Sequence, residues 1–206
     1  MKKPLNRSII RKAVKHLESS DPVLSGLIRT HGPCTISPAV ANPFHALASS
    51  IISQQISARA ARAIKSRLLA LLGRDQFTPE GFLRLSPKEI RNAGLSRPKV
   101  EYIRGIARAV ESGSLDFPSL YHCEDEEVIA NLVTLSGVGR WTAEMFLIFG
   151  LGRPDVLSVL DAGLRKGFQV SYRLPTPPSA AEMMAAGERW RPYRTVASWY
   201  LWRVID

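Results

Sequence analysis

The sequence predicts an all-α protein, and three kinds of signal carry that prediction. Two Ser-x-x-Glu capping boxes, Ser86–Glu89 and Ser179–Glu182, mark helix starts, because each side chain can satisfy the other residue's backbone N–H. Apolar residues between such signals recur at helical spacing. Only Val156–Leu160 has a strand-like composition, and five residues do not make a sheet. The 206 residues therefore divide into about ten short helices.

Helix boundaries follow from start and stop residues along the chain. Asn42-Pro43 begins an apolar-periodic helix, and a second helix, rich in Ala and Leu, follows Gln54-Gln55 and stops at Gly73. Further helices are expected to start at Thr78-Pro79, Ser86, Ser179 and Pro192, and the last of these is rich in aromatic residues. Gly94 ends the helix that starts at Ser86, and Gly113 ends a helix over residues 98–112.

The chain is strongly basic, and this narrows the class of partner. It carries 28 Lys and Arg against 18 Asp and Glu, a net charge of +10 at pH 7. Such a charge favours a polyanion, either nucleic acid or an anionic membrane surface, over a basic surface that serves only solubility. No apolar stretch approaches the ~20 residues that span a bilayer. Lys2 and Lys3 are not followed by the apolar segment of a secretory signal.

The cysteines predict neither a disulfide framework nor a metal site. Cys34 and Cys123 form no CxxC pair, and the four histidines show no ligand spacing. We therefore expect two free thiols in an intracellular protein.

The segment Leu132–Gly150 is the most informative part of the sequence. It contains the end of one apolar helix, then Gly137-Val-Gly139, then a new helix from Arg140 onward. Glycines let a backbone turn tightly and approach a ligand closely, and the N–H groups of the following helix suit a phosphate. Gly137, Gly139, Arg140 and Thr142 are the candidate phosphate ligands. The GxG pattern alone favours an ordinary corner between two helices, without a ligand.

The surrounding motifs resemble the helix-hairpin-helix superfamily of DNA base-excision glycosylases. They combine LxGxGRxTA with an Asp about twenty residues later, in VLSVLDAGLRKG. IISQQIS at 51–57, AGLSRPKV at 93–100 and ERWRPYR at 188–194 extend the match over residues 43–206. The chain is most similar to the alkylation-repair branch, a short form of the 3-methyladenine DNA glycosylase II type. The longer members have an additional N-terminal β-rich domain.

The resemblance implies two helical lobes with a DNA-binding cleft between them. Residues 43–160 would form the central lobe, with the hairpin near 132–150. Residues 1–42 and 161–206 would form the second lobe of a single glycosylase unit.

Asp161 matches the family's catalytic carboxylate. A carboxylate beside a sugar that becomes cationic can stabilise the charge and orient water. The same residue before Ala-Gly-Leu-Arg is also a good helix N-cap, and both roles can hold together. Leu160 stands where many relatives have a second Asp.

The base pocket and the DNA wedge are also implied by the resemblance. Trp141 and Trp202 would stack on a flipped, cationic base, with Met145 beside them where a related enzyme has an aromatic ring. Gln55 would fill the space left by the flipped nucleotide, with Gln54 next to it. Core packing for the tryptophans, and an ordinary exposed loop for the glutamines, are the alternatives.

The resemblance implies no required cofactor. The hairpin would hold Na⁺ or K⁺ through the backbone carbonyls of Val133, Leu135 and Val138. The iron–sulfur cluster of some relatives is excluded, because it needs four C-terminal cysteines and none follows Cys123.

The leading hypothesis is a monofunctional glycosylase that removes alkylated purines of the 3-methyladenine and 7-methylguanine type from double-stranded DNA. It would act as an intracellular monomer without membrane contact, near the nucleoid in a bacterium or in the nucleus of a eukaryote. One alternative is a glycosylase/lyase for oxidised bases, which needs a lysine where Trp141 stands. Another is a DNA-binding module without catalysis, which leaves Asp161 and the aromatic residues unexplained.

Overall fold

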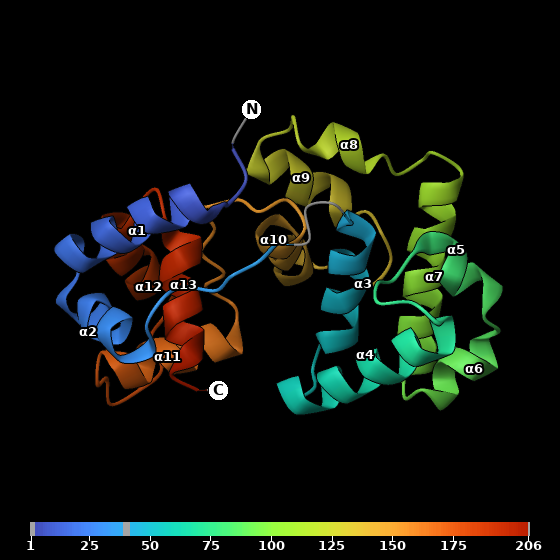
Figure 1. Cartoon of the computed structure of the whole chain (residues 1–206), viewed down its shortest axis with the longest axis horizontal. Helices are drawn as coiled ribbons and strands as arrows, with labels where there is room; N and C mark the ends of the chain where they lie inside the picture. The colour runs from blue at the N-terminus through green and yellow to red at the C-terminus, as the bar shows by residue number, and fades with distance from the viewer. Residues whose placement is uncertain (1–2, 39–41, 206) are drawn as a thin grey trace. The chain divides into compact units, whose positions relative to one another are not determined.

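The computed structural model describes residues 3–38 and 42–205, and it confirms the all-α prediction (Figure 1). The described residues contain no strand, and Val156–Leu160 forms loop and turn. The helices are α1 (Arg7–Ser20), α2 (Pro22–His31), α3 (Pro43–Ser53), α4 (Ala58–Leu72), α5 (Pro79–Arg84), α6 (Pro87–Asn92), α7 (Arg97–Glu111), α8 (Phe117–Leu120), α9 (Asp125–Leu132), α10 (Arg140–Phe149), α11 (Ala162–Ser171), α12 (Ala180–Gly187), the 3₁₀ helix η1 (Glu188–Trp190) and α13 (Arg194–Arg203). No described helix has the length and apolarity needed to cross a bilayer.

The predicted helix starts are realised by side-chain caps. Both capping boxes form, with Ser86 and Glu89 opening α6 and Ser179 and Glu182 opening α12. Gly73 ends α4 in the left-handed conformation. The terminal helix is an exception, because α13 begins at Arg194 and not at Pro192. Its first N–H groups are bound by residues 154 and 155, and this fixes where the helix begins.

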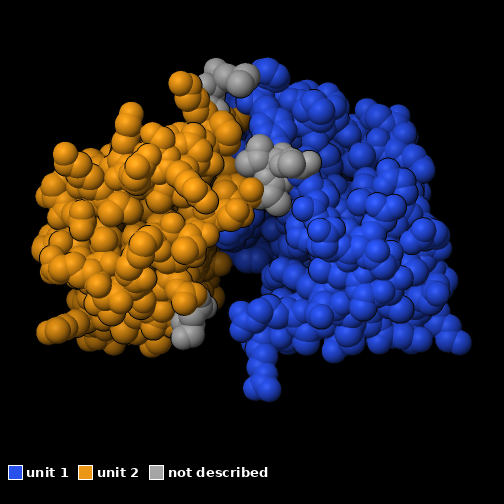
Figure 2. Space-filling view, viewed as in Figure 1, with its two compact units in different colours: residues 1–2, 39–151 blue, residues 3–38, 152–206 orange. Residues whose placement is uncertain are grey.

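The chain divides into two compact units (Figure 2). Unit 1 comprises residues 39–151, of which 42–151 are described, and unit 2 comprises residues 3–38 and 152–206, described as far as 205. The division falls between Leu151 and Gly152, whereas the sequence predicted it after residue 160.

Hydrogen bonds explain why residues 152–160 belong to unit 2. The Gly152 carbonyl accepts the Leu5 N–H at 2.7 Å, and the Thr195 hydroxyl donates to the Arg153 carbonyl at 2.7 Å. Asp155 forms an ion pair with Arg194 at 2.8 Å. The other predicted boundary, between residues 42 and 43, adjoins residues 39–41, which lie outside the described residues.

Unit 1 is organised around α3, which packs against α10, α4 and α7. Its sequence, PFHALASSIIS, is apolar on most sides, as expected of a helix surrounded by others. Phe82 of α5 contacts Phe44 and Phe77 edge to face, with ring centroids 6.0 and 5.4 Å apart. This core fixes the N-terminal end of α3 against α5, and α3 in turn packs on α10.

Unit 2 contains α1, α2, α11, α12, η1 and α13, and a buried carboxylate ties several of them together. Asp21 is 1% exposed and caps α2 by accepting the N–H groups of Val23 and Leu24. Its other oxygen accepts the Tyr172 hydroxyl at 2.5 Å and the Trp190 indole N–H at 2.9 Å. Burial and the neighbouring Asp21 carboxylate raise the pKa of Tyr172 well above its usual value, so its hydroxyl stays a donor.

Replacing Asp21 by Ala removes the acceptor for four donors, two buried and two part-buried, and we expect a loss of about 3 kcal/mol in the free energy of unfolding. Asn6→Ala removes the exposed N-cap of α1 and should cost only about 1 kcal/mol. Urea denaturation followed by circular dichroism measures both variants. Equal losses would show that the Asp21 network contributes no more than a single cap.

Candidate functional site

The predicted hairpin joins α9 to α10 in unit 1. Its turn is closed by two hydrogen bonds, from Leu135 N–H to the Leu132 carbonyl at 3.0 Å and from Val138 N–H to the Leu135 carbonyl at 3.1 Å. Gly137 has φ +81°, a conformation that favours glycine. A Cβ atom at Gly137 would overlap the ring of Tyr102, which lies on α7. Gly137 is therefore required by the packing of the hairpin on α7.

Gly139 meets a different constraint. It is exposed and stands at the N-cap of α10 with φ −93°, which any residue can adopt. A Cβ there would meet no described atom within 4 Å, and no described side chain caps the helix. Folding alone therefore does not explain this glycine. An uncapped helix N-terminus behind a residue without a side chain is suited to a close approach by a phosphate.

Arg140 was predicted to bind phosphate, and the structure places its guanidinium against two carboxylates. Nη2 lies 2.6 Å from Glu126 Oε1, and Nε lies 3.0 Å from Glu144 Oε1. Hydrogen bonding to Glu126 raises the pKa of Arg140, and the same bond lowers the pKa of Glu126. The positive charge of Arg140 is largely compensated, so the α10 backbone is the stronger phosphate candidate.

The structure corrects the predictions for Thr142 and Gln54. Thr142 is 2% exposed, and its hydroxyl accepts a hydrogen bond from Gln54 Nε2 at 2.8 Å. The same Nε2 donates to the Gly137 carbonyl at 2.9 Å. The Thr142 side chain is thus not available to a phosphate, and the Gln54 side chain is not a DNA wedge. Together they fasten the hairpin to the C-terminal end of α3.

Gln55 keeps the features expected of a wedge. It is exposed and has φ +56°, a rare conformation for a residue other than glycine. Its neighbour Ile56 is also exposed. The turn between α3 and α4 therefore presents Gln55 at the surface of unit 1.

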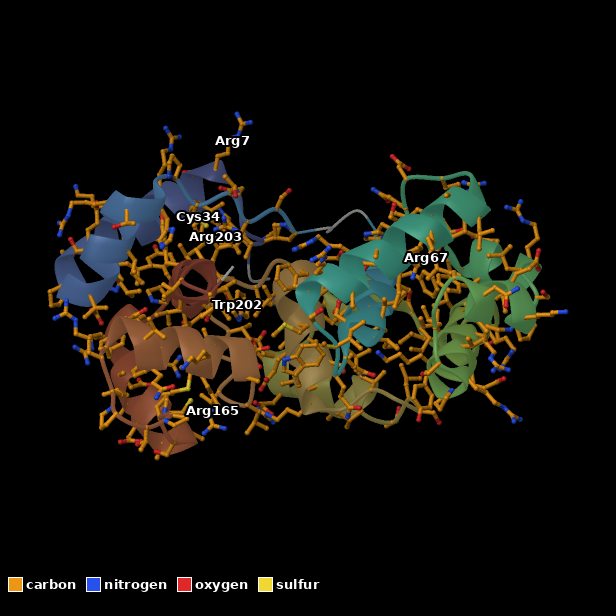
Figure 3. The ribbon with its side chains drawn as sticks, turned by 90° about the horizontal axis from the view of Figure 1, so that it is seen from below. Arg7, Cys34, Arg67, Arg165, Trp202 and Arg203 are labelled. Atoms are coloured by element: carbon orange, nitrogen blue, oxygen red, sulfur yellow. The ribbon has the colours of Figure 1, made fainter. Side chains whose placement is uncertain are left out.

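Asp161 in unit 2 is both an N-cap and the hydrogen-bond partner of a predicted pocket residue. Its Oδ1 accepts the Leu164 N–H at 2.5 Å, which caps α11. The same oxygen accepts the indole N–H of Trp202 at 2.9 Å (Figure 3 labels Trp202). The structure thus brings Asp161 and Trp202 together from α11 and α13. Both side chains are partly exposed.

Trp141 and Met145 lie four residues apart on α10, and therefore on one face of that helix. Trp141 is half-buried and Met145 is 5% exposed. Their roles in base recognition stay predictions.

The three carbonyls predicted to bind a cation all belong to the hairpin, at residues 133, 135 and 138. The Leu135 carbonyl already accepts the Val138 N–H, and a carbonyl oxygen has a second lone pair for a ligand. Neutral oxygen donors suit a hard monovalent cation, so the donor set fits Na⁺ or K⁺. The described residues contain no cluster of His, Cys, Asp or Glu that could hold a metal ion.

Lys99 and Tyr102, both on α7, contribute to this region and were not predicted from the sequence. Lys99 Nζ donates to the carbonyls of Ile52 and Gln54 at the end of α3, at 2.9 and 2.6 Å. A lysine in the first turn of a helix is disfavoured by the helix dipole, and this was the available signal that Lys99 has a partner elsewhere. No sequence signal identifies Tyr102.

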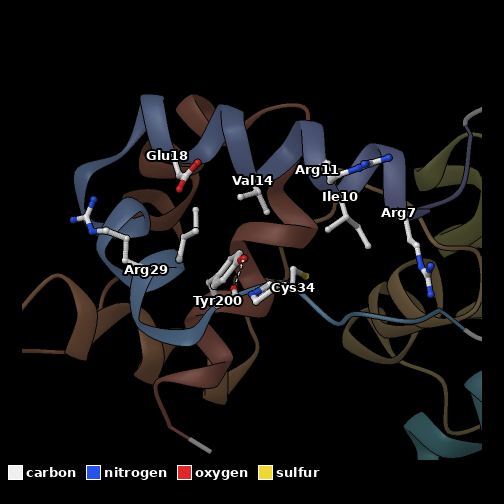
Figure 4. Close-up of a pocket in the computed structure, with 11 residues that line it drawn as sticks. Arg7, Ile10, Arg11, Val14, Glu18, Arg29, Cys34 and Tyr200 are labelled. Carbon is white, nitrogen blue, oxygen red and sulfur yellow. Dashed lines mark hydrogen bonds between the residues drawn. The ribbon is translucent and has the colours of Figure 1, made fainter.

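Unit 2 also contains a groove of about 700 Å³ (Figure 4). Ile10 and Val14 line one side, Tyr200 lies in the groove, and Arg7, Arg11 and Arg29 stand at its edge. Tyr200 donates a hydrogen bond to the Gly32 carbonyl, and burial raises its pKa to about 12. None of the predicted site residues lines this groove.

Comparison with known proteins identifies the family. Residues 48–192 match the family model of the HhH-GPD superfamily of base excision DNA repair proteins. DNA-3-methyladenine glycosylase 1 of Schizosaccharomyces pombe is 34% identical over 200 residues, covering 94% of this chain and 87% of the relative. Alkylbase DNA glycosidase-like protein mag2 of the same yeast is 31% identical, covering 94% of this chain and 93% of the relative.

A solved structure of the S. pombe 3-methyladenine DNA glycosylase in complex with abasic DNA superposes with a TM-score of 0.85 at 34% identity. The match covers 93% of this chain and 95% of the other. A DNA-3-methyladenine glycosidase from Bacillus halodurans is 42% identical, with a TM-score of 0.73 over 93% of this chain and 88% of the other. The all-helical fold thus has its counterpart in known repair proteins, and the chain belongs to the HhH-GPD superfamily of base excision DNA repair proteins.

Proposed function

We propose that the protein is a monofunctional DNA glycosylase that hydrolyses the N-glycosidic bond of alkylated purines. The observation that carries the proposal is the Asp161 carboxylate, held by the Leu164 N–H and the Trp202 indole N–H. A carboxylate fixed by two donors is preorganised to face developing positive charge. The relatives named as 3-methyladenine glycosylases support the same substrate class.

The reaction breaks the bond between the sugar C1′ and the purine nitrogen. The bonding electrons go to the base, and an N7- or N3-alkylated purine that is cationic leaves as a neutral molecule. The sugar becomes cationic, and Asp161 stabilises that charge and orients water. The water oxygen bonds to C1′ and its proton leaves to the carboxylate or to solvent, giving an abasic site and the free base.

Recognition of the base follows from its charge. Alkylation makes the purine electron-poor, so the electron-rich faces of Trp141 and Trp202 favour it over an undamaged base by cation–π stacking. Met145 supplies a polarisable surface without the ring of a third aromatic. The indole N–H of Trp202 holds Asp161, so Trp202 connects recognition to the catalytic carboxylate.

The DNA partner is a duplex containing the damaged base, bound by a monomer. The α10 N-terminus binds a backbone phosphate, and Gly139 lets it approach. Na⁺ or K⁺ on the carbonyls of Val133, Leu135 and Val138 adds positive charge beside that phosphate. Gln55 enters the stack in place of the flipped nucleotide. The abasic DNA in the S. pombe complex supports DNA as the partner.

Asp161→Asn tests the chemistry and leaves the cap in place, because Asn is as good an N-cap as Asp. We expect the rate of base release to fall at least about 100-fold, since the electrostatic stabilisation is lost. Affinity for DNA should change by less than about threefold, because no phosphate contact is altered. Single-turnover release of 7-methylguanine measures the rate. A wild-type rate in this variant would restrict Asp161 to its role as a helix cap.

Gly139→Asp tests the phosphate site. A carboxylate at the exposed N-cap should weaken DNA binding at least about tenfold on any sequence, and the loss should be largest at low salt. The folded state should be unaffected, because a side chain there meets open space. Gly137→Ala is the contrasting variant. Its added Cβ overlaps the ring of Tyr102, so it should destabilise the folded protein, whereas Gly139→Asp should not. Unchanged binding by Gly139→Asp would exclude this hairpin as the phosphate anchor.

A hydrolase needs no protein amine bonded to the sugar, so borohydride should trap no protein–DNA adduct. Among the residues of α10, none is a lysine, and Arg140 stays protonated. Lys166, five residues after Asp161, donates to Gln169 at 3.3 Å. Incubation with alkylated duplex and sodium borohydride measures the adduct. A yield comparable to that of a known lyase would establish the alternative lyase activity.

A further inference from the structure

The turn between α3 and α4, residues 54–57, is largely exposed and lies beside a cavity. Gln55 is in the left-handed region and exposed, and Ile56 is 38% exposed. A cavity of about 220 Å³ separates this turn from the turn between α6 and α7. Gln54, Gln55 and Ile56 line one side of it, and Gly94 to Ser96 line the other. The 54–57 turn therefore has room to collapse inward.

The opposite wall of the cavity is held independently. Arg67 of α4, labelled in Figure 3, donates from Nε to the Ala93 carbonyl at 2.8 Å. Leu95 is buried in the core of unit 1. If one side of the cavity moves, it is the side that carries Gln55.

Lys99 is hydrogen-bonded to the backbone where α3 ends and the 54–57 turn begins. Its ammonium donates to the Ile52 carbonyl at 2.9 Å and to the Gln54 carbonyl at 2.6 Å. These carbonyls carry the negative end of the α3 dipole, so the interaction is one between a charge and a dipole. Lys99 lines the cavity and is only partly exposed, and this burial lowers its pKa. Burial strengthens the electrostatic attraction.

The same region is tied to the hairpin. The Gln54 side chain bonds to the Gly137 carbonyl and the Thr142 hydroxyl, and Gly137 rests on the ring of Tyr102. Lys99 and Tyr102 are three residues apart on α7, so one helix supports both the turn and the hairpin. The phosphate anchor and the wedge are thus parts of one hydrogen-bonded assembly within unit 1.

We propose that Lys99 is a positioning residue for base flipping. By binding the end of α3, it keeps Gln55 exposed where it can replace the flipped nucleotide, and at a fixed distance from the phosphate bound by the hairpin. The proposal rests on the proposed glycosylase function. Lys99 acts through Gln55 and does not touch the base. Its effect should therefore depend on how firmly the target base is stacked and paired, because the wedge compensates for lost stacking and pairing.

Lys99→Met keeps the length of the side chain and removes the two hydrogen bonds. The measurement is single-turnover release of 7-methylguanine from two duplexes of one sequence. In one the lesion is paired with cytosine, and in the other it is the centre of three consecutive mismatches, where flipping needs little energy. We expect the rate on the paired duplex to fall at least about tenfold, and the rate on the mismatched duplex by less than about twofold.

Lys88→Met is the matched control, because it removes the same charge from an exposed position on neighbouring α6. We expect it to leave the ratio of the two rates at the wild-type value. Equal losses on both duplexes for Lys99→Met would indicate a general structural defect and would overturn the proposal. Lys99→Arg, which can also donate to two carbonyls, should recover most of the paired-duplex rate.

Amide hydrogen exchange of the protein without DNA gives a readout independent of activity. Exchange at residues 54–57 should be faster in Lys99→Met than in wild type, and exchange in the α10 core should be unchanged. If wild-type protein releases no methylated base, the proposed function fails, and the exchange experiment still decides whether Lys99 holds the turn. Unchanged exchange at residues 54–57 overturns the role given to Lys99.

Discussion

The close approach of Gly137 to the ring of Tyr102 is the constraint on which the geometry of unit 1 depends. It sets the distance of the hairpin from α7, and α7 in turn carries Lys99 to the end of α3. Because no Cβ fits between the Gly137 backbone and the Tyr102 ring, the hairpin packs on α7 at one close distance. This packing constrains the direction of α10, and with it the position of Trp141 and Met145. A packing contact thereby constrains where the N-terminus of α10 points.

Polar groups with distant partners complete the arrangement in both units. Gln54 bonds to residues 83 and 88 positions away, and Asp21 bonds to Tyr172 and Trp190 from 151 and 169 positions away. Such buried and part-buried polar bonds add little net stability, but a missing partner is costly, so they discriminate against other packings. Each unit has a mainly apolar core, and a few such hydrogen bonds select one arrangement of its helices.

The sequence was sufficient for the fold class, most helix boundaries and the identity of the hairpin, since these depend on residues a few positions apart. The capping boxes at Ser86 and Ser179 are local and formed as expected. The roles of Gln54, Thr142 and Arg140 could not be predicted, because their partners are set by packing between helices. The sequence does not distinguish an exposed Gln from a partly buried one with hydrogen-bond partners on another helix. The boundary at Leu151 was missed for the same reason, since long-range bonds from Leu5, Arg194 and Thr195 define it.

Under the proposed function, the bond between Trp202 and Asp161 limits how the substrate range of the protein can diverge. Among the aromatic residues that stack well, only tryptophan can offer an indole N–H to the carboxylate and a broad face to a base. Exchange of Trp202 for tyrosine or phenylalanine would alter two properties at once, so selection should hold this position. Met145 makes no such bond, and its flexible side chain accepts replacement. Divergence toward other damaged bases would therefore start on α10, with the α13 tryptophan retained.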